Sequence, residues 1–200
     1  MLKLCSKQMV AGAAVAGLLA AVGCHVESDK RGDGKNVNIS TPFGGLHVRT
    51  NDAAVLESIG LAAYPGATPV KKKDDDSADV DMHFGKFQLR VKAANYRTDD
   101  PMDKVEAFYR NDLKRYGDVV ACRGNDPIGE PTRTMTGLTC DDSGHHHTIS
   151  VGDSDKHNEF HLKAGSPTHQ HIVGVQSDHG GTQFALVVLD LPSGASDESK

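Results

Sequence analysis

Residues 79–92, Asp-Val-Asp-Met-His-Phe-Gly-Lys-Phe-Gln-Leu-Arg-Val-Lys, decide the fold, because apolar and polar side chains alternate on both sides of one glycine. Alternation with a period of two is typical of a strand with one buried face. Gly85 separates the two alternating runs, where a tight turn favours a residue that tolerates positive φ. The stretch therefore predicts an antiparallel hairpin.

Similar alternation later in the chain predicts more strands, at Ile149 and Val151, at Phe160 and Leu162, and at His171, Val173 and Val175. The run from Phe184 to Leu189 is instead continuously apolar. This run predicts a central strand covered on both faces, although a buried helix has the same pattern.

One helix is expected between these strands, from about Pro101 to Tyr116. Asp100 suits the N-cap, Pro101 the first helical position and Gly117 the stop. The apolar side chains fall on one stripe: Met102, Val105, Tyr109, Leu113 and Tyr116. The sequence thus predicts an α+β fold, with one main helix (about 101–116) packed on a mostly antiparallel β-sheet in a single domain.

The beginning of the chain has the pattern of a secretory signal. Lys3 and Lys7 precede residues 9–23, which carry no charge and end in small residues. The motif Ala21-Val22-Gly23-Cys24 resembles the lipobox of bacterial lipoproteins, in which the cysteine is acylated on sulfur and becomes the mature N-terminus. The resemblance implies a lipid anchor at Cys24. A soluble secreted protein is the alternative, because Ala21-x-Gly23 also fits an ordinary cleavage site.

Composition divides the chain into four parts. Residues 1–23 are the expected signal peptide, and the polar, glycine-containing residues 24–36 are expected to be a flexible tether. Residues 37–191 are long enough for one domain, and residues 192–200 are expected to be a disordered tail.

The charge balance excludes one class of partner. Removing residues 1–23 takes away two lysines and no acid, so the formal charge moves from −5 to −7. Nucleic acid is therefore an unexpected partner, since phosphate binding needs a basic patch. The only basic run, residues 71–73, is followed at once by three aspartates at 74–76 and is expected to be a solvated turn.

Two separated motifs carry a second resemblance. Tyr64-Pro65-Gly66-Ala67, followed by Thr98-Asp99-Asp100-Pro101 and Lys104-Val105-x-x-Phe108-Tyr109, resembles a domain of uncharacterised bacterial secreted proteins and lipoproteins. The resemblance covers about residues 43–122. It implies the fold and an exported location, and it carries no catalytic residue to this chain.

Cys122 and Cys140 end two expected strands, 119–122 and 135–140, on either side of a turn-rich loop. In an oxidising compartment this pair predicts a disulfide across a hairpin. The pair is also the even set left when Cys5 is removed with the signal and Cys24 is acylated. The alternative, a Cys140 nucleophile with His145 and Asp141, lacks any group that would orient the histidine.

Eight of the eleven histidines lie between residues 145 and 179. Imidazole binds zinc, copper or nickel, and two histidines at alternate strand positions share one face. A candidate metal site therefore combines Asp141 or Asp142 with five histidines: His145, His146, His147, His169 and His171. The spacing matches no zinc signature, so exposed or structural histidines are the alternative.

No catalytic residue is predicted, because the chain has no HExxH, GxSxG, P-loop or GxGxxG motif. The expected function is a membrane-tethered bacterial lipoprotein of the periplasm or cell surface, acting as a non-enzymatic binding or structural module of the envelope. A periplasmic metal-binding protein is the alternative, and a secreted enzyme is the third hypothesis.

Overall fold

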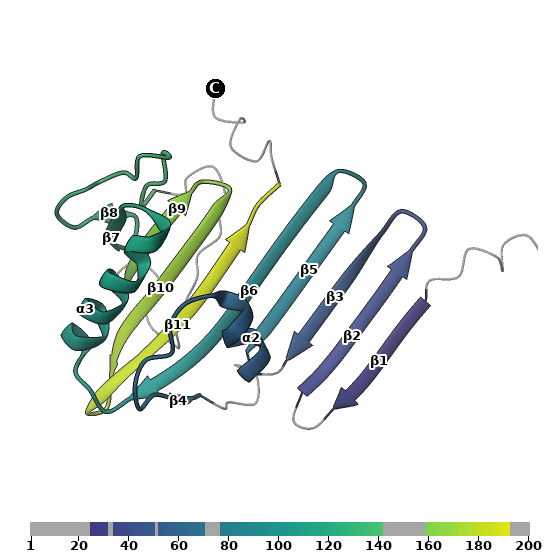
Figure 1. Cartoon of the computed structure of the whole chain (residues 1–200), viewed down its shortest axis with the longest axis horizontal. Coiled ribbons are helices and arrows are strands. Elements are labelled where there is room, and N and C mark those ends of the chain that lie inside the picture. Colours follow the sequence, from purple (N-terminus) through teal and green to yellow (C-terminus); the bar gives the residue numbers. More distant parts are fainter. Residues whose placement is uncertain (1–24, 32–33, 51, 71–76, 142–158, 193–200) are drawn as a thin grey trace, which may run out of the picture.

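The computed structural model describes residues 25–31, 34–50, 52–70, 77–141 and 159–192, which fold around one long sheet (Figure 1). In chain order the elements are β1 (His25–Arg31), β2 (Gly34–Thr41), β3 (Gly44–Thr50), α2 (Asp52–Ile59), β4 (Thr68–Pro69), β5 (Ala78–Phe84), β6 (Phe87–Thr98), α3 (Met102–Leu113), the 3-10 turn η1 (Lys114–Tyr116), β7 (Val119–Arg123), β8 (Asp126–Pro127), β9 (Phe160–Ser166), β10 (His169–Asp178) and β11 (Gly181–Asp190). The sheet order is β1-β2-β3-β5-β6-β11-β10-β9-β7-β8, with β4 paired to β6. All these pairings are antiparallel.

The hairpin predicted around Gly85 is present as β5 and β6. Phe84 and Phe87 close it as directly opposed residues, and Gly85 has a φ of 58°. The continuously apolar run lies in β11, between β6 and β10, and residues 182–189 are all buried. Both strand predictions are therefore confirmed. Ile149 and Val151 lie outside the described residues.

The predicted helix is present as α3 followed by η1. Val105, Tyr109 and Leu113 are buried, as the apolar stripe predicts. The cap differs from the prediction, since Pro101 is the N-cap and makes no side-chain cap. The Asp100 carboxylate instead accepts hydrogen bonds from the Tyr64 hydroxyl and the Lys104 ammonium, each at 2.9 Å.

The antiparallel sheet is confirmed, but the fold is dominated by that sheet and is not a balanced α+β arrangement around one main helix. A second helix, α2, also packs on β6. Val55 and Ile59 are its buried contacts, and Gly60 with φ of 74° follows it. An eight-residue helix of this kind depends on tertiary packing, because such a short helix is marginal by itself.

The two helices cover one face of the sheet over β6, β11, β10 and β9, where the main core lies (Figure 1). The opposite face has smaller buried clusters, one around Ile172 and Val187 and one around Val120 and the two cysteines. Strands β1, β2, β3 and β5 extend beyond the helices as a wing of the sheet (Figure 1). The helices thus define a core end, which holds the groove described below, and an open end.

Residues 25–31 and 34–36, assigned above to a flexible tether, lie in strands of the sheet. Residues 25–31 form β1, and β1 pairs with β2 from His25 opposite Ser40 to Arg31 opposite Gly34. The tether prediction is therefore wrong for these residues. Charged, polar residues are common on an edge strand because they oppose edge-to-edge association, and composition alone reads them as a linker.

Candidate functional site

The structure describes only part of the predicted metal cluster. His145, His146 and His147 lie outside the described residues, as do Asp142 and the proposed acylation site Cys24. His169 and His171 lie side by side on β10, with ring centroids 5.2 Å apart. Among the described residues, no group of three or more histidine, cysteine, aspartate or glutamate side chains is placed to hold a metal.

The two described histidines have different surroundings. The His169 ring is exposed, and its Nδ1 contacts Asp190. His171 is 4% exposed and stacks on the Tyr116 ring with centroids 3.6 Å apart. Burial, and then the neighbouring His169, lower the pKa of His171 to about 4. His171 is therefore a neutral, packed imidazole at neutral pH, in agreement with the alternative that this histidine is structural.

The two motifs of the secreted-protein resemblance meet in space. Tyr64 is buried beside Phe108 and Tyr109, and its hydroxyl donates to Asp100 at the start of α3. The backbone carbonyl of Asp100 accepts a hydrogen bond of 2.7 Å from the Thr182 hydroxyl. Burial and then the Asp100 contact raise the pKa of Tyr64, while Lys104 and then Tyr64 lower the pKa of Asp100. These residues join α3 to the sheet and have a structural role.

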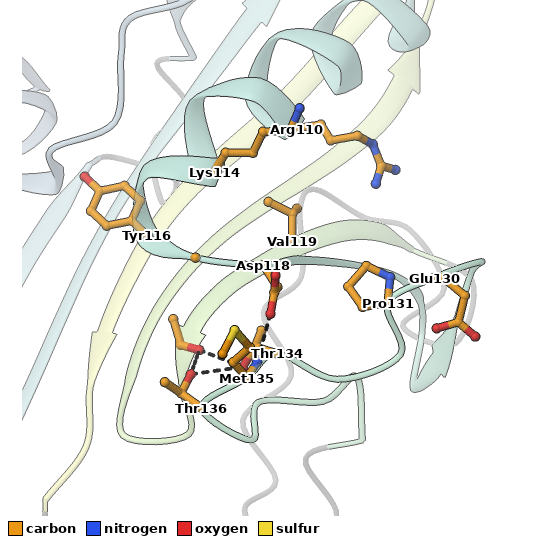
Figure 2. Close-up of a pocket in the computed structure, with 12 residues that line it drawn as sticks. Arg110, Lys114, Tyr116, Asp118, Val119, Glu130, Pro131, Thr134, Met135 and Thr136 are labelled. Carbon is orange, nitrogen blue, oxygen red and sulfur yellow. Dashed lines mark hydrogen bonds between the residues drawn. The ribbon is translucent and has the colours of Figure 1, made fainter.

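A groove lies between the end of α3 and the loop of residues 130–136 (Figure 2). Its volume is about 650 Å³, which is large enough for a small ligand or a short peptide segment. Arg110 of α3 and Lys114 of η1 form one wall, and Pro131 and Met135 of the loop lie on the other side (Figure 2). We call this cavity the α3 groove.

The loop that forms the α3 groove is held in place by several contacts. The hydroxyls of Thr134 and Thr136 both donate to the Gly165 carbonyl, at 3.0 and 2.6 Å. The Met135 amide donates to the Asp118 carboxylate at 2.9 Å, as the dashed line in Figure 2 shows. Leu138, two residues beyond this wall, is buried. The loop is therefore a fixed wall of the groove, which suits binding because little ordering is needed.

The predicted disulfide between Cys122 and Cys140 fastens the segment directly after this loop to β7. The two Cα atoms are 5.6 Å apart, and both residues are buried. The disulfide is confirmed, but its second partner differs from the prediction. Residues 135–140 form no strand, and only an isolated bridge pairs Arg133 with Thr139. The bond thus joins a strand to a loop and does not cross a hairpin.

The charges around the α3 groove differ in how they are engaged. Arg110 forms an ion pair with Glu106 at 2.6 Å. Within the part of the chain that the structure describes, the Lys114 ammonium and the Glu130 carboxylate have neither a hydrogen-bond nor an ion-pair partner. Met135 at the rim is 95% exposed. The groove therefore offers a cation, a carboxylate and an apolar thioether to a ligand.

The groove was not predicted from the sequence, because Lys114 and residues 130–136 belong to no known binding motif and show no periodic pattern of apolar residues. One feature of the sequence could have indicated it: Met135 is an apolar residue in a turn-rich loop that the cysteine pair closes.

Comparison of the chain with protein-family models, with curated proteins and with solved structures finds no match. In the described residues no helix is long and apolar enough to cross a membrane.

Proposed function

We propose that the protein is an exported, lipid-anchored, non-enzymatic binding module of the bacterial cell envelope, and that the α3 groove receives an extended peptide segment of an envelope partner. The observation that carries the binding proposal is the combination of a fixed wall, an open groove and unpartnered polar groups at its rim. Extended peptides are recognised by backbone hydrogen bonds together with pockets for alternate side chains.

The start of β7 supports a peptide as the ligand, because β8 pairs only with Cys122 and Arg123 at the end of that strand. The Ala121 carbonyl accepts a hydrogen bond of 2.7 Å from the Ile128 amide, on the edge of β7 away from β9. Backbone groups of alternate residues in a strand point to the same edge. The N–H and C=O of Val119 therefore face this edge too, and Val119 lines the α3 groove. A peptide strand added there would pair with the start of β7, before the residues that β8 pairs with.

The rim charges support the same ligand class. Lys114 and Glu130 lie on opposite sides of the groove and offer complementary contacts to a chain carrying both charge types. Met135 is a flexible apolar side chain of the kind that adapts to varied partners. Specificity would come from the charges, and affinity from the backbone and the apolar contacts.

The anchoring part of the proposal rests on the chain before the sheet. The Ala21-Val22-Gly23-Cys24 motif supports acylation, and the Cys122–Cys140 bond supports an oxidising compartment. This pairing leaves Cys24 as the one cysteine from residue 24 onward without another cysteine to pair with. The net negative charge of the chain also makes a peptide a better candidate ligand than nucleic acid, whose phosphates need a basic surface.

The binding proposal is tested by selecting random peptides displayed on phage against the chain from residue 24 onward, exported and bearing Cys24→Ser. Peptide affinity is then measured by fluorescence anisotropy for three variants. Lys114→Glu and Met135→Ser, both at exposed groove positions, are expected to weaken the selected peptides about tenfold each. Lys86→Glu, an exposed lysine far from the groove, is the matched control and should leave affinity unchanged.

The proposal fails if no peptide is enriched over the uncoated surface, or if enriched peptides bind both groove variants as tightly as the unmodified chain. The metal hypothesis gains no support from the described residues, since His171 packs on Tyr116 and His169 contacts Asp190. It stays a prediction for the histidines at 145–147.

A further inference from the structure

Three exposed phenylalanines gather at two neighbouring hairpin tips of the wing. Phe43 is 80% exposed in the β2–β3 tip, and Phe84 and Phe87 are 46% and 43% exposed in the β5–β6 tip. These are half of the six phenylalanines in the chain. Aromatic side chains of this size are normally buried, so a cluster of exposed ones marks an interaction surface. We call these three residues the phenylalanine edge.

The strand register places the two tips side by side at one end of the sheet. Thr41 lies opposite Gly44, Gly44 opposite Phe84, and Phe84 opposite Phe87, so one row crosses both tips. Figure 1 shows these tips as adjacent loops at the upper side of the wing. The phenylalanine edge is therefore a continuous feature across the tips.

The first residue of β1 lies at the same end of the sheet. His25 pairs with Ser40, and Ser40 pairs with Gly45. Gly45 pairs in turn with His83, which places His25 one register row from the row that crosses both tips. Cys24, the proposed acylation site, directly precedes His25 in the chain.

The tip that carries Phe43 is held in a fixed conformation. The Thr41 hydroxyl donates to the Gly44 carbonyl at 2.8 Å and accepts a hydrogen bond from the Gly44 amide at 3.1 Å. The Phe84 ring lies against Gly44, where a β-carbon would come within 2.5 Å of the ring. Phe43 is thus presented by a preorganised turn, which lowers the entropic cost of contact.

The chemistry of the tips suits a bilayer surface. Residues 41–45 and 83–88 contain one lysine, one histidine and no carboxylate, although the chain has 27 acidic residues. Phe84 and Phe87 also share the sheet face of Met82 and Leu89, and Met82 and Leu89 are directly opposed. The apolar surface therefore continues from the wing to its tips, with Lys86 available to lipid phosphates.

We propose that the phenylalanine edge inserts into the lipid bilayer beside the acylated Cys24 and holds the wing against the membrane. This inference rests on the proposed lipid anchor. An acyl chain on Cys24 would keep the edge at high effective concentration near the bilayer, so modest apolar contacts suffice. The α3 groove lies at the other end of the strand order, next to β7 and β9.

The chain has no tryptophan, so a single substitution gives a specific fluorescent reporter. The chain from residue 24 onward has one thiol outside the disulfide, Cys24, which is coupled to a maleimide lipid in phosphatidylcholine vesicles. Phe43→Trp is the reporter. Ile128→Trp is its control, since Ile128 is 40% exposed beside β8, at the other end of the strand order.

The Phe43→Trp emission is expected to shift to shorter wavelength on tethering, to be quenched by brominated acyl chains and to be protected from aqueous iodide. The Ile128→Trp emission should remain sensitive to iodide. Adding Phe84→Ser and Phe87→Ser to the Phe43→Trp chain should reduce quenching by brominated lipid at least threefold, because the anchoring area is lost.

Full iodide sensitivity of tethered Phe43→Trp would overturn the inference. So would a blue shift that appears in vesicle-free solution as protein concentration rises, since that outcome assigns the edge to a second copy of the chain. Chemical coupling makes this test independent of acylation in the cell. A protein that inserts when coupled but carries no acyl chain in bacteria would contradict the proposed anchor and not the chemistry of the edge.

Discussion

Removing the Cys122–Cys140 bond tests how the wall of the α3 groove is held. The change is the double variant Cys122→Ala, Cys140→Ala, which introduces no polar group into the buried cluster around Val120. The bond joins β7 to the loop that follows residues 130–136. Its loss should therefore weaken both the global fold and the local position of the groove wall.

The magnitude follows from the separation of the two cysteines. They are 18 positions apart, and a cross-link of that length removes enough entropy from the unfolded chain to contribute about 3 kcal/mol. Both residues are buried, so replacing the sulfur atoms by hydrogen leaves a small cavity that costs about 1 kcal/mol more. The free energy of unfolding should fall by roughly 4 kcal/mol in all.

Equilibrium urea unfolding of the exported chain measures the global effect. The unmodified chain with its disulfide reduced is the matched control, because it lacks the cross-link but keeps both sulfur atoms, and should lose about 3 kcal/mol. Amide hydrogen exchange measures the local effect. The Met135 amide, which donates to Asp118, should exchange faster in the double variant than global unfolding alone explains.

An unfolding free energy within 1 kcal/mol of the unmodified chain would show that the cross-link does not stabilise the fold to this extent. Unchanged exchange at the Met135 amide would show that the threonine contacts to Gly165 suffice to hold the loop, and the assigned role of the disulfide in the groove would be wrong.

Three further predictions concern the core and the tips. Tyr109→Phe should leave stability unchanged or raise it by up to about 1 kcal/mol in urea unfolding, since the buried Tyr109 hydroxyl has no hydrogen-bond partner among the described residues; a loss above 1 kcal/mol would contradict this. The folded-state pKa of His171 is about 4, below its ordinary 6.5, so this residue's contribution to stability is complete above pH 6.5 and falls by up to about 3 kcal/mol on acidification to pH 4. Arg115 also lowers this pKa, while Asp190 and Asp112 raise it. His171→Phe should flatten the profile over that window, and an unchanged slope would count against the assignment. Gly44→Ala should destabilise the β2–β3 tip by 1 kcal/mol or more, because its β-carbon would lie 2.1 Å from the His83 carbonyl oxygen; equal stability in thermal unfolding would contradict the close approach.

The periodic pattern of apolar residues correctly predicted those strands and helices in which the pattern follows directly from the burial of one face or of both faces. The β5–β6 hairpin around Gly85, the buried strand β11 and the stripe of α3 are all present, because alternation and helical spacing record which side chains face the core. The disulfide was predictable for a different reason, since cysteine arithmetic needs no geometry.

The elements that the sequence did not predict are set by tertiary contacts. Helix α2 is short and stabilised by packing on β6, and β1 is held by pairing with β2 in spite of its polar composition. The Asp100 side chain contacts Tyr64 and Lys104, 36 positions upstream and four downstream, and so does not cap α3. The preference of aspartate for the N-cap depends only on local sequence, and here the contact of Asp100 with the distant Tyr64 replaces the cap.

The two proposed sites were unpredictable from residue patterns for the same reason. The α3 groove forms where a loop packs beside Asp118 and Gly165, residues 17 to 31 positions away from their loop partners. The phenylalanine edge depends on strand register, because Phe43 and Phe84 become neighbours only when β3 pairs with β5. A linear motif records neither relation.

The lipid anchor at Cys24 is the central claim, and acyl-chain labelling in a bacterium tests it most directly. The full chain is expressed with an alkyne-tagged palmitate, and labelling is compared among the unmodified chain, Cys24→Ser and the Cys122→Ala, Cys140→Ala control. Acylation at Cys24 predicts label on the unmodified chain and on the control, and no label on Cys24→Ser. Label that persists on Cys24→Ser, or an unlabelled chain with its signal removed, would show that Cys24 is not acylated.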